Sequence, residues 1–408
     1  MLGFFNNMIS VIVTILFSYQ IVYIFVSLFI QEKEKEYEHR YNNFAVLICA
    51  RNEELVISDL LTSIRQQSYP KDRYATFVLA DNCSDHTAEV AQKHGAIVYE
   101  RYNNNLIGKG YALSELLNNI ERDYGDIFDG FLVFDADNIL DKNYLEQMNI
   151  SYCKGNHIIA GYINSKNYSS NWISAGYSLF LLKKNRFLNN ARHLLGLSCA
   201  INGTGFLFDK RIVKNWTYHT LTEDIEFSVD QACRHNRISY CSKAILYDEQ
   251  PTSFKQSFYQ RLRWAKGYLQ VIRKYSLKLI KGIGERDFSC YDMLNTIISA
   301  YSLSIVSVFA NITIFIFSII SDTDIIPLLI SVLYGLIKAY IGMYLLGLLT
   351  TITEWKMIKA NKHDKIIFTF TFPIFIATYI PIAIYALFVK VKWVPIKHSL
   401  TMKQENVL

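Results

Sequence analysis

The sequence predicts an α/β domain with a mostly parallel sheet, combined with transmembrane and interfacial helices. Between about residues 44 and 134, short apolar runs alternate with segments of helical apolar spacing. Long uncharged apolar runs lie on either side of the mixed-polarity middle of the chain, and an amphipathic basic segment precedes the C-terminal runs. Alternating strands and helices of this kind form parallel sheets with helices on both faces.

The first apolar run, Phe4–Ile30, carries no formal charge and is long enough to cross roughly 30 Å of hydrocarbon. No basic residue precedes it and it ends in bulky residues, unlike a cleaved signal peptide. We expect a retained anchor, with Lys33, Lys35 and Arg40 keeping the following chain on the cytosolic side. A buried helix of a soluble domain is the alternative.

The middle of the chain is expected to alternate strands and helices. The expected strands are Phe44–Cys49, Phe77–Ala80, Ala96–Tyr99 and Phe131–Phe134, and the expected helices are Glu53–Gln67, about His86–His94 and Tyr111–Ile120. Ligands of such sheets bind beyond the carboxyl ends of the strands. Polar clusters of this sequence occupy those ends.

After Pro251, apolar residues recur every three or four positions with basic residues between them. This pattern predicts a helix in the membrane interface with its apolar stripe in lipid. The stripe comprises Phe254, Phe258, Leu262, Ala265, Leu269 and Ile272. Three further segments are long enough to span, Leu294–Ile320, Ile325–Thr350 and Ile366–Val389. Pro373 and Pro381 make a broken or re-entrant last segment an alternative, so the number of crossings stays open.

These patterns divide the chain into five parts. We expect an anchor and linker over 1–41, a cytosolic catalytic domain over 42–250, interfacial helices over 251–290, transmembrane segments over 291–392 and a tail over 393–408. The net charge of +6 suits an anionic membrane surface. The middle region is rich in acidic loops, which argues against nucleic acid as a partner. The seven cysteines show no zinc or disulfide spacing and are expected to be reduced.

Acidic residues follow the first two expected strands. Glu53 and Asp81 lie where a ligand would meet the sheet edge, whereas Asp85 suits a turn or helix cap. For Glu53, a favourable place at a helix N-terminus is the alternative. Lys109 lies between two glycines before a helix, where backbone and ammonium can approach a diphosphate, although the P-loop pattern is incomplete.

The strongest local signal is the pair Asp135 and Asp137 after the apolar run Phe131–Phe134. Residues two apart point to the same side of an extended chain. Neighbouring carboxylates with a diphosphate are suited to Mg²⁺ or Mn²⁺, which would neutralise charge on a departing nucleotide. A surface turn is the alternative.

Two later segments carry further candidates. Glu223 and Asp224 either open a helix or include the base that takes a proton from an acceptor hydroxyl. On the interfacial segment, Gln260, Arg263 and Trp264 share a helical face. They suit phosphate binding and a sugar platform, with an ordinary aromatic and basic interface anchor as the alternative.

Taken together, six motifs occur in a particular order between about residues 44 and 267. They are Ala50-Arg51-Asn52-Glu53, Asp81-Asn82-Cys83-Ser84-Asp85, Gly108-Lys109-Gly110, Asp135-Ala136-Asp137, Thr222-Glu223-Asp224 and Gln260-x-x-Arg263-Trp264. The ordered set resembles the membrane-bound family 2 glycosyltransferases, which include cellulose, chitin and hyaluronan synthases and ceramide glucosyltransferases. The resemblance implies a GT-A domain, a nucleotide-sugar donor that is usually UDP-linked, and inversion at the anomeric carbon.

The resemblance also implies roles on the donor side. By position, Glu53 and Asp81 would hold the nucleoside and Lys109 would lie beside the donor. Asp135 and Asp137 would serve the donor diphosphate, with Asp137 as the main ligand of the divalent ion.

For the last two motifs, the resemblance implies that Asp224 is the general base, with Glu223 beside it. Gln260 and Arg263 would clamp the diphosphate, and Trp264 would line the acceptor end. The expected product is a growing polysaccharide, and single addition to a ceramide- or diacylglycerol-type lipid is the alternative. A homodimer or an accessory export partner would suit the small membrane part. The composition suggests a bacterial source and hence the inner membrane.

Overall fold

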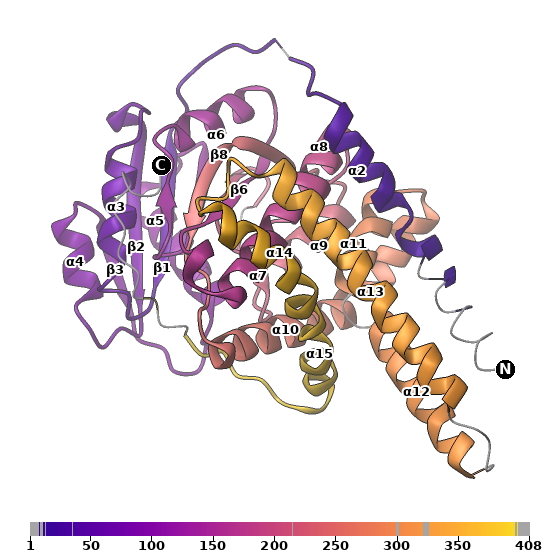
Figure 1. Ribbon diagram of the computed structural model, residues 1–408. Coiled ribbons are helices and arrows are strands. Elements are labelled where there is room, and N and C mark those ends of the chain that lie inside the picture. The colour runs from indigo at the N-terminus through magenta and orange to yellow at the C-terminus, as the bar shows by residue number, and fades with distance from the viewer. Residues whose placement is uncertain are drawn as a thin grey trace.

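The computed structural model describes residues 8, 11–12, 14–34, 36–213, 215–298, 302–320, 326–395 and 398. Its centre is one eight-stranded sheet in the order β3-β2-β1-β4-β7-β6-β8-β5, flanked by helices on both faces (Figure 1). The strands are β1 Phe44–Ala50, β2 Tyr74–Asp81, β3 Ile97–Arg101, β4 Gly130–Phe134, β5 Ile139–Leu140, β6 Ile158–Ser165, β7 Phe206–Asp209 and β8 Ser239–Asp248.

The first four strands form a parallel half-sheet, with β2 and β4 on either side of β1 and β3 beyond β2. Each strand and helix predicted for this region is present, with boundaries shifted by a few residues. The helices are α3 Ile57–Arg65, α4 Thr87–Lys93 and α5 Lys109–Tyr124, and the short turn η1 Lys71–Arg73 precedes β2. The predicted alternation and the mostly parallel sheet are confirmed.

The second half of the sheet is mixed, and no strand in it is predicted from the sequence. β7 runs antiparallel to both β4 and β6, and β8 runs parallel to β6. The strands β1, β2, β4, β6 and β8 therefore all point in one direction. Their carboxyl ends meet at one edge, although long stretches of chain separate them.

Apolar side chains alternate between the two faces of the sheet, as the two-residue period of a strand requires. Leu47 and Val133 belong to one cluster, with Leu113 of α5. Val46 and Leu132 belong to the other, under α3 and α6 Tyr144–Cys153. Both faces of the central strands are fully buried, which fixes the register and hence the positions of the strand ends.

One long helical segment covers the first face and changes its winding midway. α7 Trp172–Lys183 begins with a capping box at Asn171 and continues as the π-helix η3 Lys184–Asn189, then as α8 Asn190–Leu194. The turn η2 Tyr168–Ser170 precedes it. The π-helix begins where the segment passes the candidate site.

The predicted amphipathic helix is present, and protein covers part of its apolar stripe. α10 Phe254–Gly284 packs on α9 Glu223–Cys233, α11 Phe288–Ile298 and α15 Tyr379–Phe388. Leu262 and Ala265 of the stripe are buried against Ile382 and Ala386 of α15. Phe254 of the stripe is 46% exposed, and Phe258, Leu269 and Ile272 are half-buried. Helix α15 therefore covers the middle of the stripe, and the interfacial position of α10 stays a prediction.

The C-terminal apolar helices are α12 Ser302–Ile320, α13 Ile326–Thr353, α14 Lys362–Ala377 and α15. In the described part of the chain, two helical stretches are long and apolar enough to cross a membrane, Leu329–Thr353 and Lys362–Phe388. The second has a break at Thr378, between the two prolines that predicted one. α12 and α13 extend away from the sheet (Figure 1).

The predicted span Leu294–Ile320 is not one helix of that length. Its first residues belong to α11, where Met293 and Ile297 are buried against α9 and α10, and positions 299–301 lie outside the described residues. Three C-terminal crossings are therefore not supported by the described helices.

The described part of the predicted N-terminal anchor is α2 Tyr19–Phe29, and residues 4–7, 9–10 and 13 of that segment lie outside the described residues. The apolar stretch Thr14–Phe29 is shorter than a full span. The hydroxyls of Tyr19 and Tyr23 donate to Asp292 at 2.9 and 2.7 Å, and Asp292 also pairs with the buried Arg192. This network attaches α2 to α8 and α11.

Candidate active site

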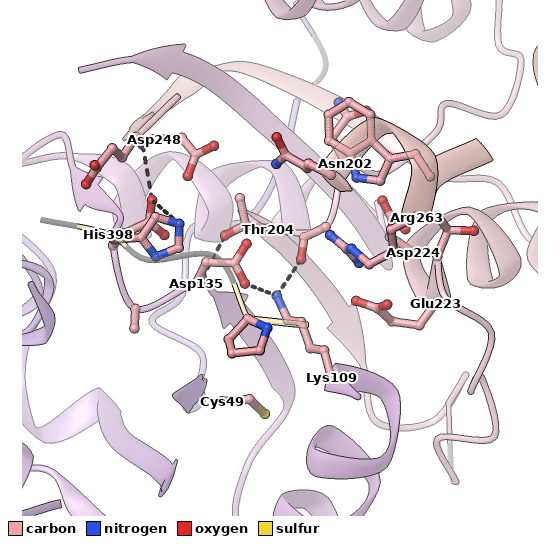
Figure 2. A pocket seen from close by; sticks show the side chains of 18 of the residues that line it. Cys49, Lys109, Asp135, Asn202, Thr204, Glu223, Asp224, Asp248, Arg263 and His398 are labelled. Carbon is pink, nitrogen blue, oxygen red and sulfur yellow. Dashed lines mark hydrogen bonds and ion pairs between the residues drawn. The ribbon is translucent and has the colours of Figure 1, made fainter. Parts of the chain in front are cut away.

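All ten side chains that the sequence nominates line one cleft at the carboxyl edge of the sheet. Figure 2 shows part of this arrangement from close by. The ten are Glu53, Asp81, Lys109, Asp135, Asp137, Glu223, Asp224, Gln260, Arg263 and Trp264. They come from the ends of β1, β2 and β4, from the first residues of α5 and α9, and from α10. The common direction of the strands brings them together.

Asp81 is held rigidly at the end of β2. Its carboxylate accepts from Arg101 Nη1 at 2.6 Å and from Asn82 Nδ2 at 2.8 Å, and the ion pair with Arg101 is almost wholly buried. Asn82 itself has a left-handed backbone with φ of 52°, which asparagine tolerates better than most residues. The strand end is therefore a sharp and well-fixed turn.

Asp85 lies outside the cleft and organises the next turn. It accepts hydrogen bonds from the backbone N–H groups of Glu54 and Thr87 at 3.2 and 3.1 Å. This is the turn-forming role that its position after Ser84 favours.

The C-terminal segment reaches the same cleft, which the sequence does not predict. His398 Nδ1 lies 3.0 and 3.2 Å from the two carboxylate oxygens of Glu53. Trp393 also lines the cleft, and Arg51 lies over its ring at 5.4 Å. Although burial opposes its charge, the neighbouring Asp137 and Glu53 raise the pKa of His398 to about 10. The described residues of the expected tail thus line the cleft.

Lys109 begins α5 and points into the cleft, where it forms an ion pair with Asp135 (Figure 2). Its ammonium also donates to the Gly203 carbonyl at 2.7 Å. Burial opposes the charge of Lys109, but Asp135 and Glu223 outweigh it and raise its pKa. The ammonium is therefore a fixed positive charge, and one oxygen of Asp135 is already engaged.

An acidic centre forms where β4 and β8 end. Burial, followed by the charges of Asp137 and Asp135, raises the pKa of Asp248 well above its usual range. Asp137 is buried and its pKa is lowered, since His398 and Lys166 outweigh the effect of burial. Asp248 is half-buried and accepts from Asn138 Nδ2 and Gln250 Nε2, each at 2.9 Å.

This acidic centre has the chemistry of a divalent-cation site. Asp137 and Asp248 offer hard oxygen ligands whose mutual repulsion a cation would relieve. No group of three or more His, Cys, Asp or Glu side chains among the described residues is arranged as a preformed metal site. The donor set therefore fits Mg²⁺ or Mn²⁺ if further oxygens come from a ligand such as a diphosphate.

Glu223 and Asp224 open α9 at the opposite wall of the cleft. Burial and then the charge of Asp224 raise the pKa of Glu223 to about 7. Burial also raises the pKa of Asp224. Carboxyl groups with raised pKa values are typical of sites of proton transfer.

The helix α10 presses directly on the loop that carries these acids. A Cβ added at Gly267 would lie 2.5 Å from Thr222 Cγ2, so only glycine allows this approach. Arg263 Nη1 donates to the Leu221 carbonyl at 3.0 Å, and the side-chain oxygen of Gln260 is buried without a hydrogen-bond partner. Both groups face the cleft with capacity left for a ligand.

Trp264 closes one end of the cleft. Its ring meets Tyr177 edge-on at 5.8 Å, and Phe180 and Tyr268 also line this end. The aromatic surroundings suit the apolar face of a sugar ring or a lipid-linked group.

Four further polar residues that line the cleft are not among the ten that the sequence analysis predicts. They are Lys184, Asn202, Asp248 and His398. Asp248 follows an apolar run and is detectable by the rule that selects Asp135 and Asp137. The other three depend on tertiary contacts and leave no periodic or spacing signal.

A sheet of this topology, with acidic side chains gathered at the carboxyl ends of its strands and at the start of the helix opposite, defines the class of GT-A domains. The family model described as "Glycosyltransferase like family 2" matches residues 41–267. The chain belongs to glycosyltransferase family 2 and is a transferase.

Relatives agree with this assignment. A probable glycosyltransferase of Bacillus subtilis is 24% identical over 85% of this chain and 83% of its own length. A beta-monoglucosyldiacylglycerol synthase of Trichormus variabilis is 25% identical over 66% of this chain and 58% of its own. A poly-beta-1,6-N-acetyl-D-glucosamine synthase of Staphylococcus aureus is 26% identical over 55% of this chain and 54% of its own. The chain thus spans little more than half the length of the latter two.

A solved structure shares the fold across nearly the whole chain. The mannosyltransferase PcManGT of Pyrobaculum calidifontis, in complex with GDP-Man and Mn²⁺, superposes with a TM-score of 0.58 at 12% identity. The match covers 94% of this chain and 98% of that one. The predicted GT-A fold is confirmed.

Proposed function

We propose that this chain is an inverting, metal-dependent glycosyltransferase that moves a sugar from a nucleotide-sugar, expected to be UDP-linked, to an acceptor at the membrane. The observation that carries the proposal is that acidic and basic side chains from distant segments of the chain line one cleft. Inverting transfer needs a base at the acceptor hydroxyl and positive charge at the departing diphosphate, on opposite sides of the sugar.

The base in this proposal is Asp224. It lies at the start of α9 across the cleft from the strand ends, and its raised pKa brings it closer to the operating pH, where a base is most effective. It takes the proton from the acceptor hydroxyl as the oxygen attacks the anomeric carbon. Glu223 stands beside it and supplies a second carboxylate.

The donor side begins with Glu53 and Asp81, which are proposed to hold the nucleoside. Lys109, Gln260 and Arg263 are then proposed to bind the diphosphate, since Lys109 and Arg263 supply cations and the Gln260 amide can donate through its N–H groups.

A bound Mg²⁺ or Mn²⁺ would be held by Asp137 and would neutralise charge on the leaving diphosphate. Asp135 is the second proposed metal ligand, although its ion pair with Lys109 makes Asp137 the principal one. Asp248, which lies beside Asp137, is a third proposed ligand.

The acceptor is proposed to bind beside Trp264, near helices α14 and α15. A growing polysaccharide is the first candidate. It is supported by the name of the Staphylococcus aureus relative, a poly-beta-1,6-N-acetyl-D-glucosamine synthase. Single addition to a lipid is the second candidate. It is favoured by the apolar helices α14 and α15 beside the acceptor end. The name of the Trichormus variabilis relative, a synthase of a glucosylated diacylglycerol, also favours it. We place the catalytic domain, residues 42–250, on the cytosolic side of a bacterial plasma membrane.

The test of the site uses membranes containing wild type, Asp137→Ala or Asp224→Asn, each supplied with a panel of nucleotide sugars and a divalent cation. Both variants are expected to lose transfer while still entering the membrane. Asp72→Asn is the matched control, because Asp72 is a largely exposed carboxylate outside the cleft. Full activity in either cleft variant would refute the assigned roles.

The length of the product decides between the two acceptors. After incubation with radiolabelled donor, a ladder of products indicates a polysaccharide. One labelled glycolipid indicates single addition.

A further inference from the structure

Lys184 enters the cleft from a part of the fold that the proposed mechanism does not use. It is the first residue of the π-helix η3, directly after α7. Asn185 Nδ2 donates to the Ile163 carbonyl at 2.7 Å and Asn189 Nδ2 to the Ala200 carbonyl at 3.0 Å, which hold the wide turn in place. π-Helical turns are rare and are frequent at functional sites. Lys184 is therefore presented to the cleft by a rigid and unusual piece of backbone.

The charge of Lys184 has no carboxylate partner. Its ammonium donates to Asn202 Oδ1 and lies 5.5 Å from the centre of the Phe180 ring. Among the described residues, none supplies a carboxylate within ion-pair distance of it. Burial consequently lowers the pKa of Lys184 to about 8, although Asp224 acts in the opposite direction.

Two other cations near the strand ends are paired with carboxylates, Arg101 with Asp81 and Lys109 with Asp135. A buried cation without a counter-ion is costly, and a bound anion removes that cost. Lys184 differs from Lys109 and Arg101 in lining the cleft with no carboxylate of the described residues within ion-pair distance.

The position of this charge is on the acceptor side. Asn202 precedes Gly203, where an added Cβ would lie 3.8 Å from Asp224 Oδ2, so the Lys184–Asn202 pair adjoins the proposed base. Phe180 and Trp264 line the same end of the cleft. On the donor side, Lys109 is already paired with Asp135.

We propose that Lys184 and Asn202 form an oxyanion subsite for the acceptor, which binds a phosphate or carboxylate carried close to the hydroxyl that receives the sugar. The inference deepens the proposed function and rests on it. It makes the acceptor an anionic molecule, either a lipid with a charged headgroup or an acidic saccharide.

The test compares an anionic and a neutral acceptor of each kind. Octyl β-D-glucuronide and octyl β-D-glucoside share ring and tail and differ in the carboxylate. Phosphatidylcholine vesicles that contain either phosphatidylglycerol or diacylglycerol provide the lipid pair, which differs in the anionic phosphoglycerol headgroup. Wild type is expected to use an anionic acceptor with a kcat/KM about tenfold or more above that for its neutral partner, as a charge-assisted hydrogen bond implies. The pair that shows the preference identifies the source of the oxyanion.

In Lys184→Met this preference should disappear because the KM for the anionic acceptor rises. The neutral acceptor and donor hydrolysis should stay within about twofold, and Lys184→Arg should keep part of the preference. Lys183→Met is the matched control. Lys183 has the same lowered pKa of about 8 and the same contact with Phe180, but it does not line the cleft.

Two results would overturn the inference while leaving the proposed function intact. The first is an active wild type with no preference for charge. The second is a Lys184→Met variant that loses both acceptors and donor hydrolysis equally, which indicates a structural role. If wild type transfers sugar to no acceptor and hydrolyses no donor, the proposed function itself fails.

Discussion

Substitution of Gly267 tests whether α10 sets the position of the acidic loop. The added Cβ in Gly267→Ala would lie 2.5 Å from Thr222 Cγ2 and 2.9 Å from Thr222 Cβ, and would also overlap Thr222 Oγ1. Ordinary contacts begin near 3.4 Å. The helix and the loop that leads to Asp224 must therefore separate by close to 1 Å, the difference between 2.5 and 3.4 Å.

The expected damage is larger for catalysis than for stability. Overpacking lowers the free energy of unfolding by about 1–3 kcal/mol, whereas replacing glycine by alanine inside a helix raises it by about 1 kcal/mol. The net loss of stability is therefore at most about 2 kcal/mol. A displacement of about 1 Å in a catalytic group can reduce the rate about 100-fold. Gly267→Ala should thus fold and enter membranes but transfer sugar far more slowly.

The assay measures initial rates of nucleoside diphosphate release at equal protein, together with thermal unfolding in detergent. Gly284→Ala is the control, because Gly284 ends the same helix and an added Cβ there meets nothing within 4 Å. The second control is a rescue. Thr222→Ala removes Oγ1 and Cγ2 and breaks no hydrogen bond, since Thr222 Oγ1 has no partner. In combination with Gly267→Ala it should restore much of the rate. A fully active Gly267→Ala, or a double variant no better than the single one, would refute the reasoning.

Three further predictions concern buried charge and the C-terminal segment. The pKa of Glu223 in the folded state, about 7, lies above the usual glutamate value of 4.5, so stability falls as pH rises between these values. Glu223→Gln should melt higher than wild type at pH 8 but not at pH 4.5, and an equal gain at both pH values would contradict this. His398→Ala should raise the donor KM about tenfold, since Glu53 loses a charged partner; a changed kcat at constant KM would point instead to obstruction of the cleft. Arg192→Met leaves a buried carboxylate unpaired and should destabilise by about 3–5 kcal/mol, which thermal unfolding measures; an unchanged melting temperature would exclude a role for this pair.

Much of the site was predictable because strand ends carry local signals. An apolar run that stops at Asp81 or at Asp135 places a carboxylate at the sheet edge wherever the strand lies. The parallel direction of the strands, which follows from their alternation with helices, then brings those edges together. Glu53, Asp81, Asp135 and Asp137 were predicted in this way. The other six predicted cleft residues came from motifs at helix starts and on the segment of α10, and the individual roles of all ten remain proposals.

Other features depend on contacts that no short pattern encodes. The placement of His398 against Glu53 joins segments 345 residues apart. Lys184 lines the cleft from the first position of a π-helix, and part of the apolar stripe of α10 is covered by α15. In both cases the local pattern fits more than one environment.

The sequence by itself determined the alternation of strands and helices, the order of the acidic motifs and the family to which the chain belongs. These follow from hydrophobic period and residue spacing, which act over a few residues. Only the tertiary structure decided which surfaces are covered, which charges find partners and which are left for a ligand. Burial and ion pairing are properties of distant segments brought together, so they appear only when the whole chain is folded.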